Sequence, residues 1–227
     1  MKKVKLFLVM LMFLLLPIST YADIIPSVSL KLGYSDPTGN VTFPGRTAGN
    51  YYLDYELTET ITDYLLSDEV FCVENADGIK GISDYTLISF DVIDVSIRSK
   101  YQAAANIAEL YYNGSESNKA AAQVAIWETI FDFGTADLGA GNFESNYNPD
   151  NTVTNILGGT YENTNNWWLA VSPALLNENT FTSSDEGKYG QNYLVRMPAP
   201  VPEPATMLLL GSGLVGLAGF GRKKLLK

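Results

Sequence analysis

The stretch NKAAAQVAIWETIF, from Asn118 to Phe131, has the spacing of a helix with one buried face. Residues three and four positions apart share that face, and most of them are apolar: Ala120, Gln123, Trp127 and Ile130. Gln123 is the exception, because a buried carboxamide must either find hydrogen-bond partners or be consumed in a covalent bond. The stretch therefore predicts a packed helix with one polar group to be satisfied.

A second helix is expected immediately before this one. Lys100 to Tyr112 places a series of apolar and small side chains on one face: Tyr101, Ala104, Ile107, Ala108 and Tyr111. Asn113-Gly114 ends that helix, and Ser115 or Ser117 caps the next. Because the link is so short, the two helices are predicted to form an antiparallel hairpin.

The segments on both sides of the hairpin have the pattern of strands. Apolar residues alternate with polar ones from Val28 to Tyr34, so one side of that strand is expected to be buried. Further strands are predicted at Val41–Phe43, Tyr51–Leu57, Val70–Glu74, Tyr85–Ile97 (as one strand or two), Trp167–Val171 and Tyr193–Arg196. Gly134 to Asn151 has the composition of a loop. Strands followed by helices and then strands predict an α+β domain, a β-sandwich or barrel with the helical hairpin packed on it.

Composition excludes several classes of function. The 227 residues contain no histidine and one cysteine, so Ser-His-Asp catalysis, Cys-His catalysis, His-ligated zinc and an internal disulfide are ruled out. The net charge is −10, which disfavours nucleic acid as a partner. No calcium loop of the EF-hand type is present. We expect no cofactor, no metal site and no enzyme activity.

Residues 1–22 have the features of a secretory signal peptide. Lys2, Lys3 and Lys5 precede the apolar run Leu6–Leu16, and Thr20-Tyr21-Ala22 has small residues where signal peptidase cuts. The expected exported domain therefore begins at Asp23 and extends to Met197.

The C-terminal end has three consecutive parts. Residues 198–204 form a Pro-rich linker with the motif Pro202-Glu203-Pro204, residues 205–221 form an apolar segment, and residues 222–227 are basic. The apolar segment is long enough for a short membrane helix. The basic stop, Arg222, Lys223 and Lys224, is expected to remain in the cytoplasm by the positive-inside rule.

This tail, Val201 to Lys227, resembles the PEP-CTERM sorting signal of exopolysaccharide-producing Gram-negative bacteria. The resemblance implies that exosortase, a membrane protease-transpeptidase, recognises the tail and cuts near the motif. The protein would be anchored in the inner membrane before processing and would then reach the cell surface or extracellular matrix. The resemblance implies a destination and leaves the activity to the domain before it.

Two residues of that domain resemble the thioester domains of bacterial surface adhesins. In those domains the sulfur of a strand cysteine is joined to the side-chain carbonyl of a glutamine in a Gln-x-x-Ile-Trp-like helix motif. The resemblance implies that Cys72 is the thiol and Gln123 the acyl donor. Ala122 and Val73 stand where those domains usually have Thr and often have Tyr. The implied function is an adhesin that captures an amine-bearing ligand or acts within exopolysaccharide.

Other interpretations of the same residues remain open. A lone cysteine often merely packs, and Gln123 can hold the helix to the sheet through a strand carbonyl. A passive structural or carbohydrate-binding surface module would use Trp167 or Trp168, which as strand neighbours point to opposite faces. A secreted glycosidase would need two carboxylates, for which the candidates are Glu128, Asp132 and Asp137.

Overall fold

Two long antiparallel strands, β1 (Ile24–Thr42) and β2 (Gly49–Ile61), pair along most of their length. Val28 and Leu30 of β1 are buried while Lys31 is exposed, as the alternation predicts. The computed structural model describes residues 24–44, 48–61, 66, 69–74, 82–135, 137–160, 166–172, 180–186 and 191–197, all within the compact unit Asp23–Pro198.

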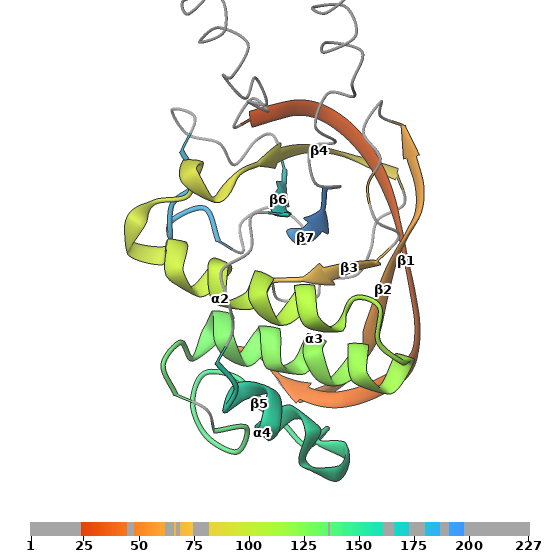
Figure 1. Ribbon diagram of the computed structural model, residues 1–227, viewed down its shortest axis with the longest axis vertical. Coiled ribbons are helices and arrows are strands. Elements are labelled where there is room, and N and C mark those ends of the chain that lie inside the picture. Colours follow the sequence, from red (N-terminus) through yellow and green to blue (C-terminus); the bar gives the residue numbers. More distant parts are fainter. Residues whose placement is uncertain are drawn as a thin grey trace, which may run out of the picture. The chain divides into compact units, whose positions relative to one another are not determined.

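Six strands close into an antiparallel barrel (Figure 1). The order around it is β2-β3-β7-β6-β4-β1, and the β1–β2 pairing completes the ring. The other strands are β3 (Glu69–Cys72), β4 (Ile82–Ile88), β6 (Trp167–Val171) and β7 (Tyr193–Arg196), while the short β5 (Glu144–Ser145) pairs with the end of β1. Closure leaves few backbone groups at free edges, which protects the protein from strand-to-strand aggregation.

The predicted helical hairpin is present as α2 (Val95–Tyr111) and α3 (Glu116–Phe131). Helix α2 begins earlier than expected, because the carboxylate of Asp94 accepts a hydrogen bond from the backbone N–H of Ser96 at 2.8 Å and caps the helix. The prediction of strand up to Ile97 is therefore wrong after Ile88. A 3-10 turn, η1 (Phe90–Val92), and the first turn of α2 follow instead.

A third helix, the short α4 (Thr152–Leu157), was not predicted. It follows the 3-10 turn η2 (Pro149–Asn151). The side-chain oxygen of Asn148 accepts from the backbone N–H of Val153 at 3.0 Å and helps to start the helix. The stretch expected to be loop, 134–151, thus also contains β5 and η2. A helix of six residues gives too little periodicity to be found from the sequence.

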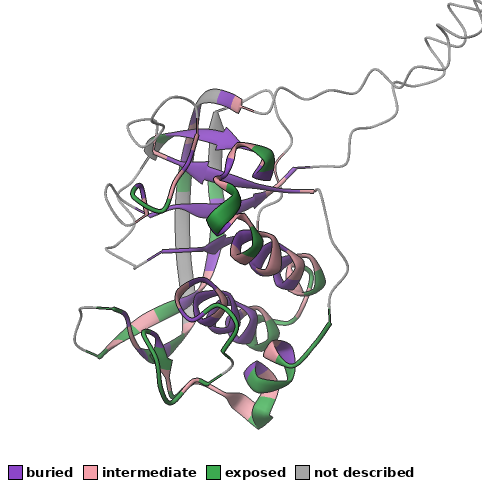
Figure 2. Ribbon diagram, turned by 90° about the vertical axis from the view of Figure 1, so that its left-hand side faces the viewer, coloured by how far each residue is buried: buried purple, intermediate pink, exposed green. Residues whose placement is uncertain are grey.

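Helix α3 is buried on every side over most of its length, more than the single face that its spacing predicts. The barrel strands β2 and β3 pack against it on one side, and α2 and α4 pack on others. Figure 2 shows the buried residues concentrated in the barrel strands and along the helices. A helix in this position carries its polar side chains into the core, where each one needs a partner.

Some predictions fall outside the described residues. These are the signal peptide 1–22, the linker 198–204 with its Pro202-Glu203-Pro204 motif, the apolar segment 205–221 and the basic tail 222–227. In the part of the chain that the structure describes, no helix has the length and apolar character needed to cross a membrane.

Candidate functional site

Cys72 lies at the end of β3, where the barrel leaves one side of that strand without a strand partner. On the β7 side, Cys72 faces Tyr193, and the next residue, Val73, donates its N–H to the carbonyl of Asn192 at 3.0 Å. Backbone groups alternate in direction along an antiparallel strand, so the N–H and C=O of Cys72 point the other way, toward β2. Strand β2 pairs with β3 at Glu69 and Val70 and does not extend this pairing to Cys72.

The side chain of Gln123 occupies the place that β2 leaves open. The backbone N–H of Cys72 donates to Oε1 of Gln123 at 2.9 Å, and Nε2 of Gln123 donates to the carbonyl of Cys72 at 2.7 Å. The carboxamide thus acts as the peptide group of an absent neighbouring strand. Both residues are fully buried. The contact between Cys72 and Gln123 that the sequence predicted is present, and the covalent bond between them stays a prediction.

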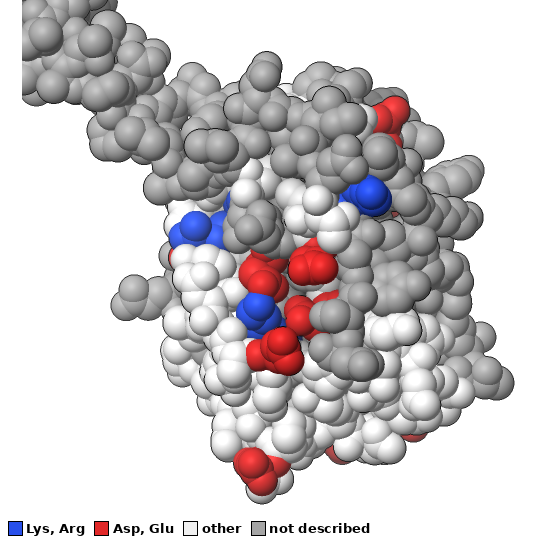
Figure 3. Space-filling model, turned by 90° about the vertical axis from the view of Figure 1, so that its right-hand side faces the viewer, with Lys and Arg blue, Asp and Glu red and all other residues white. Residues whose placement is uncertain are grey.

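A second contact joins the same strand to the same helix nearer the surface. The ammonium of Lys119, one turn before Gln123, forms a salt bridge with Glu69, three residues before Cys72. Asp54 and Glu56 of β2 add negative charge around Glu69, and burial raises the pKa of its carboxyl although Lys119 opposes this. Figure 3 shows acidic and basic side chains gathered on this side of the molecule.

The thiol of Cys72 is protonated at neutral pH. Burial raises its pKa to about 12, and the charge of Glu74 acts in the same direction. The sulfur donates a hydrogen bond to the carbonyl of Glu74 at 3.2 Å. Because the thiolate is the nucleophilic form, any reaction of Cys72 needs help to develop negative charge on sulfur.

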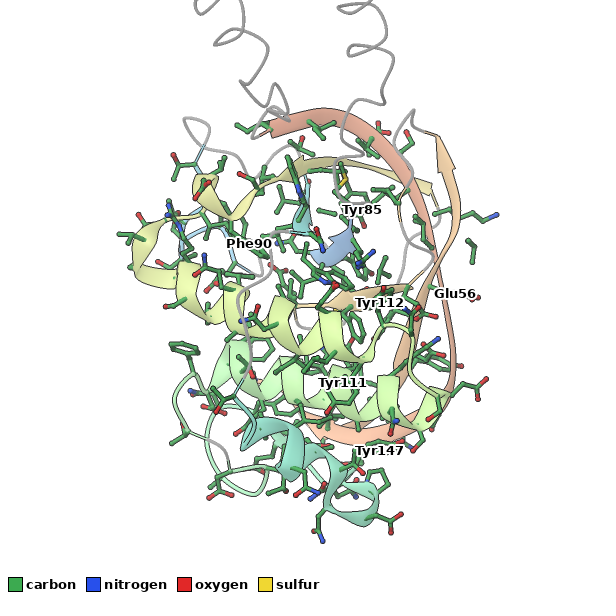
Figure 4. All side chains as sticks on the ribbon, viewed as in Figure 1. Glu56, Tyr85, Phe90, Tyr111, Tyr112 and Tyr147 are labelled. Atoms are coloured by element: carbon green, nitrogen blue, oxygen red, sulfur yellow. The ribbon has the colours of Figure 1, made fainter. Side chains whose placement is uncertain are left out.

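Polar side chains lie on the β7 side of Cys72 and Val73. The amide of Asn192 donates to the carboxylate of Glu74, and the hydroxyl of Tyr193 donates to Oε1 of Gln191. Tyr85, labelled in Figure 4, comes from β4 and packs edge-on against Tyr193. Burial, followed by the charges of Cys72 and Glu74, raises the pKa of Tyr85 to about 12, so its phenol is neutral at physiological pH.

Trp127 stands one helical turn after Gln123. Its ring packs edge-on against Phe43, with centroids 5.0 Å apart, and against Tyr55 at 6.3 Å. Both partners come from the long β1–β2 hairpin region, so the indole is fixed between α3 and the barrel wall. Its spacing from Gln123 was predicted, whereas its nearness to Cys72 comes only from the fold.

The carboxylates considered for a glycosidase are engaged with the loop that follows α3. Oε1 of the buried Glu128 accepts from the backbone N–H of Asp137 at 2.9 Å. Asp132 accepts from the backbone N–H groups of Asn142 at 2.8 Å and Phe143 at 2.6 Å. Burial, with the nearby charges of Asp132 and Asp137, raises the pKa of Glu128 to about 7. These groups hold the loop in place.

The two adjacent tryptophans of β6 are both buried, with Trp167 1% and Trp168 6% exposed. The indole N–H of Trp167 donates to Glu109 at 2.7 Å, and Glu109 also accepts from Arg196. Stacking on a sugar needs an open ring face. The burial of both rings therefore contradicts the carbohydrate-binding alternative as far as it relied on these two residues.

Within the described ranges, no group of three or more His, Cys, Asp or Glu side chains is placed to hold a metal ion.

Comparison with known proteins identifies one feature of the chain. The PEP-CTERM protein-sorting motif matches residues 200–223. The chain carries an exosortase sorting signal. Such a motif marks an exported protein that is anchored in a membrane before exosortase processes it in Gram-negative bacteria. No curated protein and no solved structure matches the chain.

Proposed function

We propose that this protein is a surface or matrix adhesin in which Cys72 and Gln123 form an internal thioester that captures an amine-bearing ligand. The observation that carries the proposal is the two-point hydrogen bonding of the Gln123 carboxamide to the backbone of Cys72. Those bonds fix the acyl group beside the residue that bears the only thiol in the chain.

One of the two hydrogen bonds would assist an attack by sulfur on the carboxamide carbon. The N–H of Cys72 already donates to Oε1 of Gln123, which is the oxygen that gains negative charge when sulfur adds to the carbon. The new carbon–sulfur bond replaces the carbon–nitrogen bond, and Nε2 leaves as ammonia with the proton of the thiol. Holding both groups in one place makes this step intramolecular and so lowers its entropic cost.

Burial would also protect the thioester after it has formed. Both residues are fully buried, so water has little access to a thioester formed there. An amine that reaches the site attacks the same carbon, forms an amide with the Gln123 side chain and releases Cys72 as a thiol. The protein would then be covalently attached to its ligand.

The sorting signal fits this use. An exosortase substrate is delivered outside the cytoplasm, where a covalent adhesin would meet amines of exopolysaccharide or of another cell surface. We further propose that residues 1–22 are removed by signal peptidase before exosortase acts.

The alternative is a passive structural surface module in which Gln123 only fastens α3 to β3. The same two hydrogen bonds support it. The two functions differ in whether the protein forms a covalent adduct.

Methylamine distinguishes them. We expect peptide mapping of the treated protein to show methylamine attached at Gln123. The adduct should be absent from Cys72→Ala, which keeps both backbone hydrogen bonds but lacks the nucleophile. An unmodified Gln123 in a folded wild-type protein would leave the passive module as the function.

A further inference from the structure

The indole N–H of Trp127 is a buried donor that lacks a partner. Trp127 is fully buried. Among the described residues, its Nε1 is one of three buried side-chain polar atoms without a hydrogen bond; the others are Oε2 of Glu128 and Oδ1 of Asn192. Buried donors are normally paired, so an exception in a closely packed core needs an explanation.

The surroundings hold this N–H in one place. Trp127 shares a face of α3 with Gln123, four residues earlier. Phe43, Tyr55 and Phe143 pack around its ring, the last with centroids 6.0 Å apart. The ring therefore cannot turn its N–H toward water or toward another acceptor without disturbing several aromatic contacts.

The sulfur of Cys72 is an acceptor close to this N–H. The indole N–H lies close enough to lower the pKa of the thiol, against the larger rise that burial causes. A neutral thiol is a weak acceptor and a thiolate is a strong one. The N–H is thus poorly paired at rest and well placed for a sulfur that becomes charged.

We propose that the indole N–H of Trp127 donates a hydrogen bond to the sulfur of Cys72 whenever that sulfur carries negative charge. The proposal rests on the thioester function. It assigns Trp127 to both halves of the reaction, as a donor that touches the reacting atom.

Sulfur becomes negative in each half. When the thioester forms, the thiol loses its proton, sulfur adds to the Gln123 carboxamide carbon, and ammonia leaves with that proton. When an amine opens the thioester, the carbon–sulfur bond breaks, and sulfur leaves as a thiolate before it takes the proton from the amine nitrogen. Glu74 beside the sulfur disfavours this charge. An interaction that strengthens only as charge develops accelerates the reaction rather than merely stabilising the resting protein.

The test compares Trp127→Phe with Trp167→Phe. Both variants remove a buried indole N–H. The N–H of Trp167 donates to Glu109 of α2 and not to Cys72, and its ring packs against Tyr112 at the end of α2. With Gln123 present, we expect methylamine to open the thioester about tenfold more slowly in Trp127→Phe, the lower range for a hydrogen bond to a charged group. The Trp167→Phe variant should react at the rate of the wild type.

A second arm does not depend on the thioester. In the Gln123→Ala background the thiol is free, and its alkylation by iodoacetamide is followed at several pH values. Adding Trp127→Phe to this background removes the proposed hydrogen bond. Alkylation should then be about tenfold slower at fixed pH than in Gln123→Ala alone. A purely structural role would loosen the core and speed alkylation instead. A slowed alkylation without any thioester in the wild type would refute the proposed function but leave the role of Trp127 standing.

The proposal is overturned if Trp127→Phe in the Gln123→Ala background is alkylated as fast as, or faster than, Gln123→Ala alone. A Trp127→Phe variant that does not fold would show a thiol that reacts as fast as in urea. In that case benzothienylalanine replaces Trp127, and its alkylation rate is compared with that of Gln123→Ala alone. That residue keeps the size and shape of tryptophan and replaces the N–H with sulfur.

Discussion

Removing the Gln123 carboxamide from a protein that cannot form a thioester measures what its hydrogen bonds contribute to folding. Cys72→Ala provides that background, because it deletes the thiol and keeps the backbone N–H and C=O to which Gln123 is bonded. Gln123→Met is then introduced, since methionine has a similar length and helix propensity but no hydrogen-bonding amide.

The substitution leaves two fully buried backbone groups without partners. Each such group costs about 1 to 3 kcal/mol, and the more favourable burial of methionine offsets part of the sum. We therefore expect Gln123→Met to lower the free energy of unfolding by about 2 to 4 kcal/mol, measured by equilibrium denaturation in urea with circular dichroism.

Gln102→Met on the half-buried face of α2 is the matched control, and we expect it to change the unfolding free energy by less than about 0.5 kcal/mol. A Gln123→Met variant that is no less stable than Gln102→Met would show that the carboxamide does not fasten α3 to β3.

Two other predictions concern the loop behind α3 and the sorting tail. The pKa of Glu128 is about 7 in the folded protein against 4.5 as its ordinary value, so the stability that Glu128 contributes is fully present below about pH 4.5 and is lost as pH rises through 7. Glu128→Gln should therefore raise the free energy of unfolding by about 2 to 3 kcal/mol at pH 9 and by much less at pH 5. Urea titrations measure this change, with Glu116→Gln at an exposed position as the control. An equal change at both pH values would contradict the prediction. Replacing Pro202, Glu203 and Pro204 with alanine should leave the protein unprocessed in the membrane fraction of cells that have exosortase, and release equal to that of the wild type would refute the role of the motif.

The helical hairpin could be predicted because its signals are local. Apolar spacing in 100–112 and 118–131 and the turn at Asn113-Gly114 decide it within a few residues of chain. The start of α2 could not be found in the same way, because Val95 to Ile97 is as apolar and β-branched as the preceding strand. The cap at Asp94, seen in its hydrogen bond to Ser96, decides that boundary.

The site was predictable only as a pair of residue types. A glutamine on a buried helix face demanded a partner, and Cys72 was a candidate by resemblance. That the partner is the backbone of Cys72 depends on where β2 stops pairing with β3, which is set by barrel closure between segments far apart in sequence. The same long-range packing brings the indole N–H of Trp127 close to the sulfur of Cys72. No local sequence pattern predicts this proximity.

The intact mass of the exported protein tests the proposed thioester most directly. A protein with the bond between Cys72 and Gln123 is lighter by one ammonia than its processed sequence requires, and the difference disappears in Cys72→Ala and in Gln123→Ala. We predict the lighter mass, together with a wild-type thiol that does not react with iodoacetamide in urea. The full mass with one thiol that alkylates in urea would contradict the thioester.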